Sequence, residues 1–208
     1  MGRTGPDLAH EVALWRRGIR YVAGADEVGR GPLAGPVVAA AVVLPAHVPA
    51  EALAGVDDSK RLSPAQRRRL AARIRRVAEA WAVVEVGVEE VDRLRIAAAS
   101  QEAVRRAVAA LPVPIGHVLV DGYANPRLAW PQTALVGGDG RTLSVAAASV
   151  LAKVHRDALM EALDARYPGY GFAEHKGYPT PAHREALARL GPSPVHRRSF
   201  RLLGGASA

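Results

Sequence analysis

Three acidic residues stand where apolar segments of the chain end. Asp26 and Glu27 follow the segment 20–25, and Asp121 follows the short apolar run 117–120. Ligands of open α/β sheets bind at the carboxyl ends of the strands, so we expect the three side chains to converge. Converging carboxylates raise one another's pKa unless a divalent cation lies among them. Because all the ligands would be oxygens, the expected cofactor is Mg²⁺ or Mn²⁺.

The neighbouring positions of Asp26 and Glu27 restrict how they can act together. Adjacent residues of a strand point to opposite faces, so the pair can share a site only where the strand ends and twists, or where a ligand lies across its end. Each acidic residue taken alone could equally be a turn or cap residue. Asp139 lies between Gly138 and Gly140, where aspartate is ordinary turn chemistry, and its role needs outside support.

The turn Gly29-Arg30-Gly31 follows the paired acids directly. Glycines let the backbone approach a ligand closely, and backbone or short groups can reach a ribose 2′-hydroxyl in a shallow minor groove. A tight turn between two strands would explain the glycines equally well, but it leaves the arginine and the adjoining acids unexplained. The pattern therefore favours recognition of ribose.

The charge balance favours a polyanionic partner. The net charge is +8 and the pI is about 10.5, and a basic protein gains affinity for nucleic acid by releasing counterions from phosphates. The lysines are only Lys60, Lys153 and Lys176, so a bias in genomic base composition could also account for the excess of arginine.

Several classes of protein are disfavoured. The chain has no cysteine, which excludes disulfides and thiolate metal sites and agrees with a reducing compartment. The apolar stretches 37–44 and 145–152 are too short to cross a bilayer, no signal-peptide pattern opens the chain, and the histidines lack the spacing of zinc ligands. We expect a cytoplasmic protein that binds neither membranes nor zinc.

The hydrophobic pattern predicts an α/β domain with a mixed sheet, because an apparent hairpin is followed by strands that alternate with helices. Expected strands cover 20–25, 36–44, 82–88, 117–120 and 133–136. Expected helices cover part of 1–19, then 63–81, 89–111, 144–167 and 180–190. We expect one domain over 1–208, with a core at about 20–167, a C-terminal helical and loop segment at about 168–208, and a partly disordered tail from Gly191.

Further motifs follow the acidic turn in a fixed order. They are Asp57-Asp58-Ser59-Lys60, Val120-Asp121-Gly122, Ala146-Ala147-Ala148-Ser149, Ala152-Lys153-Val154 with Arg156-Asp157, His175-Lys176-Gly177-Tyr178-Pro179-Thr180 and His196-Arg197-Arg198-Ser199-Phe200. In order and spacing, these motifs resemble ribonuclease HII, the type 2 ribonuclease H family, over roughly residues 21–200. Val28, where the family commonly has alanine, is a mild departure.

The resemblance implies a ribonuclease H-like fold, with a mixed five-stranded sheet flanked by helices and a small helical C-terminal segment. It implies that Asp26, Glu27 and Asp121 are catalytic metal ligands and that Asp139 is the fourth active-site carboxylate. Asp157 is the rival fourth, but it lies four residues after Lys153 and could instead form a helical ion pair or support the site from behind.

The resemblance also implies how substrate is bound. Gly29, Arg30 and Gly31 would read the 2′-hydroxyl at an RNA–DNA junction, and Tyr178 would stack on the next deoxyribose. Phosphate contacts, any of which could instead be structural, are expected from a set of polar side chains: Lys60, Ser149, Lys153, His175 and Lys176.

The implied activity is that of an endoribonuclease. It would hydrolyse the RNA strand of RNA–DNA hybrids and nick duplex DNA 5′ to embedded ribonucleotides, with two metal ions and with 5′-phosphate and 3′-hydroxyl products. A non-catalytic nucleic-acid-binding protein, or another nuclease or transposase of the same fold, is the alternative. We expect a monomer with no obligate protein partner.

Overall fold

The computed structural model describes residues 5–203, and its centre is a five-stranded mixed sheet in the order β3-β2-β1-β4-β5. Strands β1, β2 and β3 are antiparallel neighbours, whereas β4 runs parallel to β1 and β5 runs parallel to β4. The strands are β1 Val22–Val28, β2 Val37–Val43, β3 Ala80–Val86, β4 His117–Asp121 and β5 Gln132–Leu135. This arrangement confirms the expected mixed α/β sheet.

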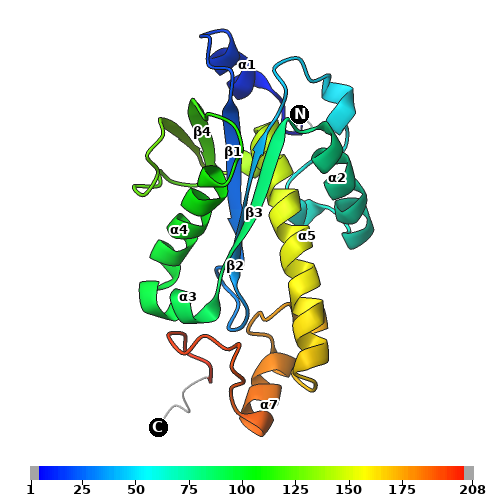
Figure 1. The fold of residues 1–208 in the computed structure, drawn as a ribbon. Helices are drawn as coiled ribbons and strands as arrows, with labels where there is room; N and C mark the ends of the chain where they lie inside the picture. Colours follow the sequence, from blue (N-terminus) through cyan, green and yellow to red (C-terminus); the bar gives the residue numbers. More distant parts are fainter. Residues whose placement is uncertain (1–4, 204–208) are drawn as a thin grey trace.

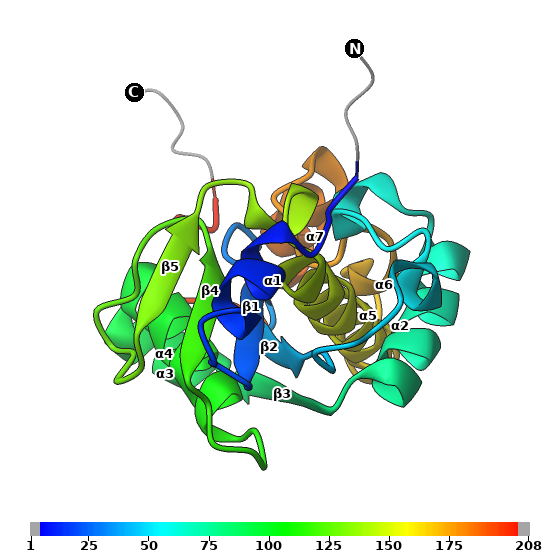
Figure 2. The same cartoon turned by 90° about the horizontal axis from the view of Figure 1, so that it is seen from above.

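Helices cover both faces of this sheet (Figures 1 and 2). Helices α3 and α4 lie on one face, while α2 and the long α5 lie on the other. The helices are α1 Ala9–Trp15, α2 Pro64–Val77, α3 Val88–Leu94, α4 Ile96–Ala109, α5 Leu143–Arg166, α6 Phe172–His175 and α7 Pro181–Leu190. Short 3-10 helices are η1 Ala50–Leu53, η2 Ser59–Arg61 and η3 Gly138–Gly140. None of the helices within residues 5–203 is long and apolar enough to span a membrane.

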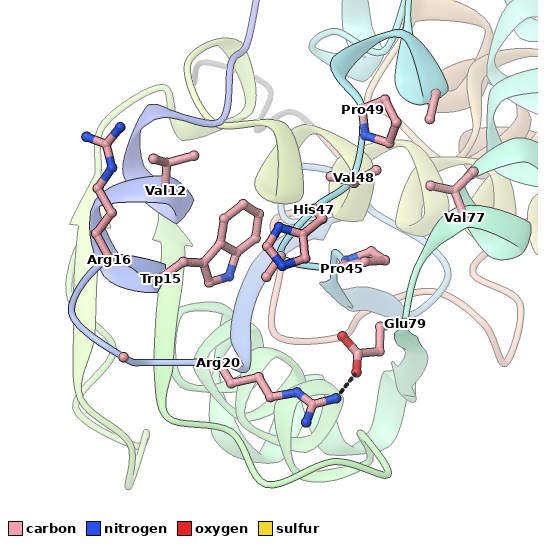
Figure 3. Close-up of a pocket in the computed structure, with 13 residues that line it drawn as sticks. Val12, Trp15, Arg16, Arg20, Pro45, His47, Val48, Pro49, Val77 and Glu79 are labelled. Atoms are coloured by element: carbon pink, nitrogen blue, oxygen red, sulfur yellow. Dashed lines mark hydrogen bonds and ion pairs between the residues drawn. The ribbon is translucent and has the colours of Figure 1, made fainter.

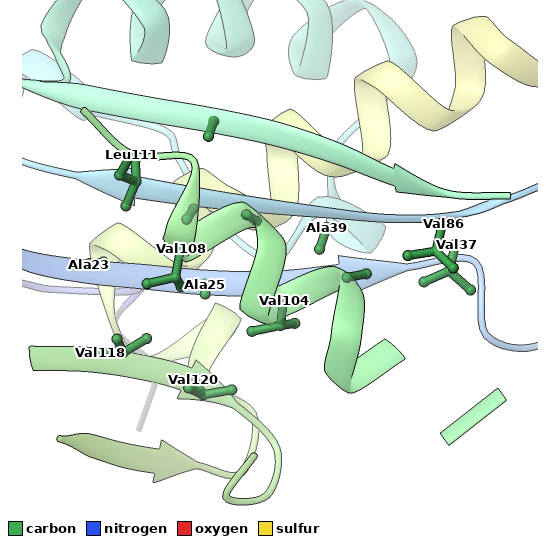
Figure 4. Close-up of a cluster of buried hydrophobic side chains, with 14 of the residues drawn as sticks. Ala23, Ala25, Val37, Ala39, Val86, Val104, Val108, Leu111, Val118 and Val120 are labelled. Carbon is green, nitrogen blue, oxygen red and sulfur yellow. The ribbon is translucent and has the colours of Figure 1, made fainter. Parts of the chain in front are cut away.

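An apolar core lies on each face of the sheet. Both cores include side chains of β2, whose seven residues are all buried and alternate between the two faces. Its odd-numbered residues, such as Val37 and Ala39, pack with α4 residues such as Val104 and Val108 (Figure 4). Its even-numbered residues pack with α2 and α5. The continuous apolar run that predicted a buried strand therefore serves both layers.

Helix α5 crosses the sheet at very close range. A Cβ on Gly24 would lie only 2.3 Å from the Ser144 backbone, so only glycine fits where the helix passes over β1. The buried carboxylate of Glu11 in α1 accepts a hydrogen bond from the Ser144 amide at 2.8 Å, near the start of α5. The N-terminal helix therefore does more than pack, because it satisfies one of the unpaired amides of α5.

Several predicted bounds are wrong by a few residues, and one predicted helix is two. The expected helix 89–111 is interrupted at Arg95, whose φ of 66° and ψ of 156° are not helical. Helix α2 ends at Val77, four residues before the predicted end, because Ala78 is extended and leads into β3. The C-terminal segment contains α7 close to its predicted bounds and the additional short helix α6.

Candidate active site

The parallel pairing of β1 with β4 brings two acidic residues side by side. Ala25 pairs with Val120, and the next residues on the two strands are Asp26 and Asp121. Asp26 is buried, and Asp121 is half-buried at the end of β4. The sheet thus places these two carboxylates at neighbouring positions on adjacent strands.

Strand β1 extends beyond the predicted segment 20–25, which was wrong at both bounds. It continues to Val28, with Asp26 paired to Ala40 and Glu27 paired to Ala39 on β2. The pairing uses backbone groups, so it can pass through the acidic residues. Because side chains alternate, Asp26 lies on the α5 face and Glu27 on the α4 face. The prediction that the strand ends before the acidic residues was therefore wrong.

Asp121 is a common neighbour of three other acidic side chains, those of Asp26, Glu27 and Asp139. We call these four residues the carboxylate cluster. Burial raises the pKa of Asp26 well above its ordinary value, and the charges of the other three raise it further. Burial and the charge of Asp121 also raise the pKa of Glu27 and of Asp139. The four acids repel one another across both faces of the sheet.

The turn at η3 connects Asp139 to the strand ends. The Gly138 amide donates to Asp121 Oδ1 at 2.7 Å, and the buried Asp139 follows directly. Lys60 Nζ lies 3.3 Å from Asp139 Oδ2, although its side chain is 77% exposed. Burial acts to lower the pKa of Lys60, but the neighbouring acids, Asp139 first, outweigh it and the net shift is upward.

The rival acid Asp157 belongs to a different group of charges. It accepts from Lys153 Nζ at 2.6 Å and lies 3.4 Å from Arg67 of α2. Asp139, in contrast, is one of the charges that raise the pKa of Asp26. The geometry therefore associates Asp139 with the carboxylate cluster and Asp157 with a helical ion pair.

The glycine–arginine–glycine turn lies next to the carboxylate cluster and faces Tyr178. Gly29 has a φ of 96°, and a Cβ there would lie 2.8 Å from the Pro36 carbonyl. A Cβ on Gly31 would lie 3.4 Å from Cε1 of Tyr178, whose ring is partly exposed. Arg30 Nη1 lies 3.3 Å from Glu27 Oε1. The predicted substrate-reading residues are thus neighbours of one another and of the acids.

Two buried arginines hold this turn, and the sequence interpretation gave neither of them a role. Arg197 is fully buried and donates five hydrogen bonds, of 2.6–3.2 Å, to four carbonyls of the loop 29–35: those of Gly29, Arg30, Pro32 and Gly35. Arg156 donates to the carbonyls of Ala34, Pro36 and Lys176. A signal was present for Arg156, because Ala152, Arg156 and Met160 share the buried stripe of α5 at helical spacing.

The remaining predicted phosphate contacts are less uniform than expected. Ser149 is buried and donates to Ser59 Oγ at 2.9 Å, and it also lowers the pKa of Asp26. Both ring nitrogens of His175 are bound to backbone, so its side chain is not available to a phosphate in this arrangement. Lys153 and Lys176 line a different cleft, with Arg67 and Arg68, and each lysine is bound to an acid.

The acids border a small cleft, and a larger cavity lies elsewhere. Glu27, Asp121 and Ser100 line a cleft of about 230 Å³ between the strand ends and α4. A cavity of about 1000 Å³ lies at the other end of β1, where its single acidic lining residue, Glu79, is bound to Arg20 (Figure 3). Across residues 5–203, no three histidine, cysteine, aspartate or glutamate side chains already stand in a metal-ligating arrangement.

Comparison with known proteins identifies the family. Residues 23–203 match the family model described as ribonuclease HII. The chain is 56% identical to the ribonuclease HII of Moorella thermoacetica over 193 residues, which cover 93% of this chain and 92% of that protein. It is 54% identical to the ribonuclease HII of a Synechococcus strain, over 94% of this chain and 88% of that protein.

Solved structures agree with this result. The ribonuclease H2 of Pyrococcus horikoshii matches with a TM-score of 0.74 and 28% identity, over 88% of this chain and 94% of that one. An Archaeoglobus fulgidus ribonuclease HII, solved as a complex with PCNA, matches with a TM-score of 0.68 and 27% identity, over 89% of this chain and 98% of that one. The fold is therefore ribonuclease H-like, and the chain belongs to the ribonuclease HII family of ribonuclease H endonucleases.

Proposed function

We propose that the protein hydrolyses the RNA strand of RNA–DNA hybrids and nicks duplex DNA 5′ to embedded ribonucleotides, leaving 5′-phosphate and 3′-hydroxyl ends. The observation that carries this proposal is the position of the carboxylate cluster beside the Gly29–Gly31 turn and Tyr178. Hydrolysis and ribose recognition then involve adjoining residues. A nuclease that cuts only DNA has no evident use for the Gly29–Gly31 turn and Tyr178.

We propose Mg²⁺ or Mn²⁺ as the cofactor, held by Asp26, Glu27, Asp121 and Asp139. The donors are all carboxylate oxygens, and the raised pKa values of Asp26, Glu27 and Asp139 mark a shortage of positive charge. When bound, a divalent ion would lower the pKa of an attacking water and stabilise the leaving oxygen. The acids would have to converge further to share an ion, since they do not form a ligating group by themselves.

The chain's own residues would orient the substrate. Gly29 and Gly31 would let the backbone reach the ribose 2′-hydroxyl, and Arg30 would lie between that turn and Glu27. Tyr178, which faces Gly31, would stack on the deoxyribose that follows the ribonucleotide. Lys60 would neutralise a phosphate near Asp139, because its ammonium lies there and its side chain is mostly exposed.

The test is cleavage of a labelled DNA duplex with one ribonucleotide, beside all-DNA and RNA–DNA hybrid controls, in Mg²⁺, Mn²⁺ or EDTA. We expect a nick 5′ to the ribonucleotide that disappears in EDTA. Cleavage of the hybrid alone would contradict the roles of the turn and Tyr178. Cleavage of all-DNA duplex would favour another nuclease of this fold, and binding without cleavage would favour a non-catalytic protein.

We also propose that the chain works as one domain and as a monomer. The C-terminal segment is bound to the loop 29–35 through Arg197, so it supports the site instead of forming a separate unit. Light scattering should give the mass of one chain, with and without a duplex. A mass of two chains would contradict the monomer.

A further inference from the structure

Three histidines lie side by side in the C-terminal segment, apart from the carboxylate cluster. The rings of His175 and His183 are stacked with centroids 4.3 Å apart, and those of His183 and His196 are 5.2 Å apart. His183 and His196 are buried, with exposed fractions of 0% and 2%. The proposed reaction has no use for either residue as a catalyst.

The hydrogen bonds of this group assign a proton to each buried ring. The Ser193 amide donates to His196 Nδ1 at 3.0 Å, so in the neutral ring the proton lies on Nε2. That Nε2 lies 3.0 Å from His183 Nε2, which must then accept. His183 therefore carries its own proton on Nδ1 and donates to the Tyr178 carbonyl at 2.9 Å.

Burial favours this neutral state. It lowers the pKa of His183, and together with the charge of His183 it lowers the pKa of His196 to about 4. Both rings are then neutral near pH 7. The result is a directed chain of hydrogen bonds from Ser193 through two histidines to the backbone of Tyr178.

The backbone before Tyr178 is held as firmly. The Gly177 amide donates to His175 Nδ1 at 3.1 Å, and the Gly177 carbonyl accepts from the Leu33 amide at 2.8 Å. The Lys176 carbonyl accepts from Arg156 at 3.0 Å. Lys176 and Gly177 both have positive φ, of 51° and 83°, so this turn is one that external bonds must maintain.

The side chain of Tyr178 has a different environment from its backbone. Its residue is 40% exposed, and its ring lies over Gly31 of the substrate-reading turn. With the backbone bound on both sides, the ring keeps its place relative to Gly31 without side-chain bonds of its own. The Tyr178 carbonyl accepts a hydrogen bond from the Thr180 amide at 2.8 Å as well as from His183. The histidine chain supplies the one that comes from a side chain, so its loss would leave only the local turn to hold the carbonyl and would let the ring move.

We propose that His183 and His196 are positioning residues that hold the Tyr178 carbonyl, and thereby set the preference of the enzyme for a single ribonucleotide in DNA over a continuous hybrid. This inference rests on the proposed function, which gives Tyr178 and the Gly29–Gly31 turn their roles at the junction. Phosphate contacts and the carboxylate cluster serve both substrates. The ring of Tyr178 serves the junction, so its displacement changes the ratio of the two activities.

The sharpest test compares His183→Asn with His183→Gln. The amide of asparagine occupies the place of Nδ1 and can still donate to the Tyr178 carbonyl, whereas the longer glutamine places its amide nearer Nε2. We expect the kcat/KM ratio, single-ribonucleotide duplex over hybrid, to fall roughly tenfold in His183→Gln and to stay within about twofold of wild type in His183→Asn. Equal ratios in the two variants would overturn the inference.

A double-variant cycle tests whether the effect passes through the tyrosine. In a Tyr178→Ala background, His183→Gln should produce no further fall in the ratio. The same tenfold fall in that background would mean that His183 acts elsewhere, and would also overturn the inference. His155→Gln is the matched control, because His155 lies on α5 and its ring is bound to the exposed Glu85 and not to Tyr178. Its ratio should remain that of wild type.

Cleavage by the wild-type enzyme distinguishes a failure of the proposed function from a failure of the inference about the histidines. If wild type does not nick at the ribonucleotide, both the proposed function and the inference fail. If wild type nicks there and the His183 variants keep its substrate ratio, the inference alone fails. Thermal unfolding of each variant, measured beside the kinetics, distinguishes a shift in the ratio from a general loss of folded enzyme, which lowers both activities together.

Discussion

The carboxylate cluster and the loop 29–35 both contain buried polar groups, but they differ in whether the protein itself supplies partners of opposite charge or hydrogen-bond donors for those groups. In the cluster, burial and the charges of neighbouring acids raise the pKa of Asp26, Glu27 and Asp139, and the cations bound there, Lys60 and Arg30, have side chains 77% and 59% exposed. In the loop, the buried guanidinium of Arg197 donates five hydrogen bonds to carbonyls and lies over the ring of Phe200. The polar groups of the loop are paired within the protein, whereas we propose that a divalent cation from outside balances the charge of the cluster.

This contrast predicts opposite effects on activity and stability when the cluster is neutralised. Asp121→Asn should lower cleavage by about a thousandfold or more, since a lost metal ligand costs several kcal/mol at about 1.4 kcal/mol per tenfold. Asp26→Asn should do the same, and should raise the melting temperature without metal, because a folded-state pKa above the unfolded value means that the charged form destabilises the fold. Cleavage assays and thermal unfolding without metal measure the two quantities. Full activity in either variant would remove the assignment.

The arginine-bound loop should respond in the other direction. Arg197→Lys places one ammonium where four carbonyls need a fork of donors, so we expect a loss of roughly 3–5 kcal/mol in the free energy of unfolding. Denaturant unfolding measures it. Arg198→Lys is the control, because Arg198 is exposed beside it and should change stability little. Equal stabilities of the two variants would show that the loop does not depend on Arg197.

The histidine chain should make part of the stability depend on pH. The folded pKa of His196, about 4, lies below the unfolded value of about 6.5, so the unfolded chain takes up a proton first. The stabilisation by neutral His196 is present above pH 6.5 and is lost as the pH falls toward 4. The difference in unfolding free energy between wild type and His196→Leu should therefore narrow over this range, by up to about 3 kcal/mol. A constant difference from pH 7 to pH 4 would contradict the neutral chain.

The smallest effect should come from the cation beside the cluster. Lys60→Met removes the ion pair with Asp139, but a pair whose cation is 77% exposed contributes only about 0–1 kcal/mol. Unfolding in urea should show a change within that range. A loss above about 2 kcal/mol would mean that Lys60 already neutralises much of the negative charge of the cluster. The cluster would then resemble the loop 29–35, whose polar groups are paired within the protein.

Much of the fold followed from local patterns. The apolar run of β2, the Ser63 capping box of α2 and the apolar stripe of α5 all predicted elements within a few residues of those observed. The break at Arg95 did not follow, because both flanking segments have helical periodicity and only its backbone angles separate them. The continuation of β1 through Asp26 was also missed, since the pairing with β2 that extends it is not written in β1 itself.

The types of the elements and the chemistry of the acidic, glycine-rich and basic motifs could be predicted from the sequence alone, because periodicity and motif spacing are properties of neighbouring residues. The tertiary structure decided which of those groups meet. It associates Asp139 with Asp121 and leaves Asp157 with Lys153, and it binds both ring nitrogens of His175 to backbone. It also carries Arg197 to carbonyls more than 160 positions earlier in the chain. Such contacts depend on strand register and on helices crossing the sheet, so no local pattern contains them.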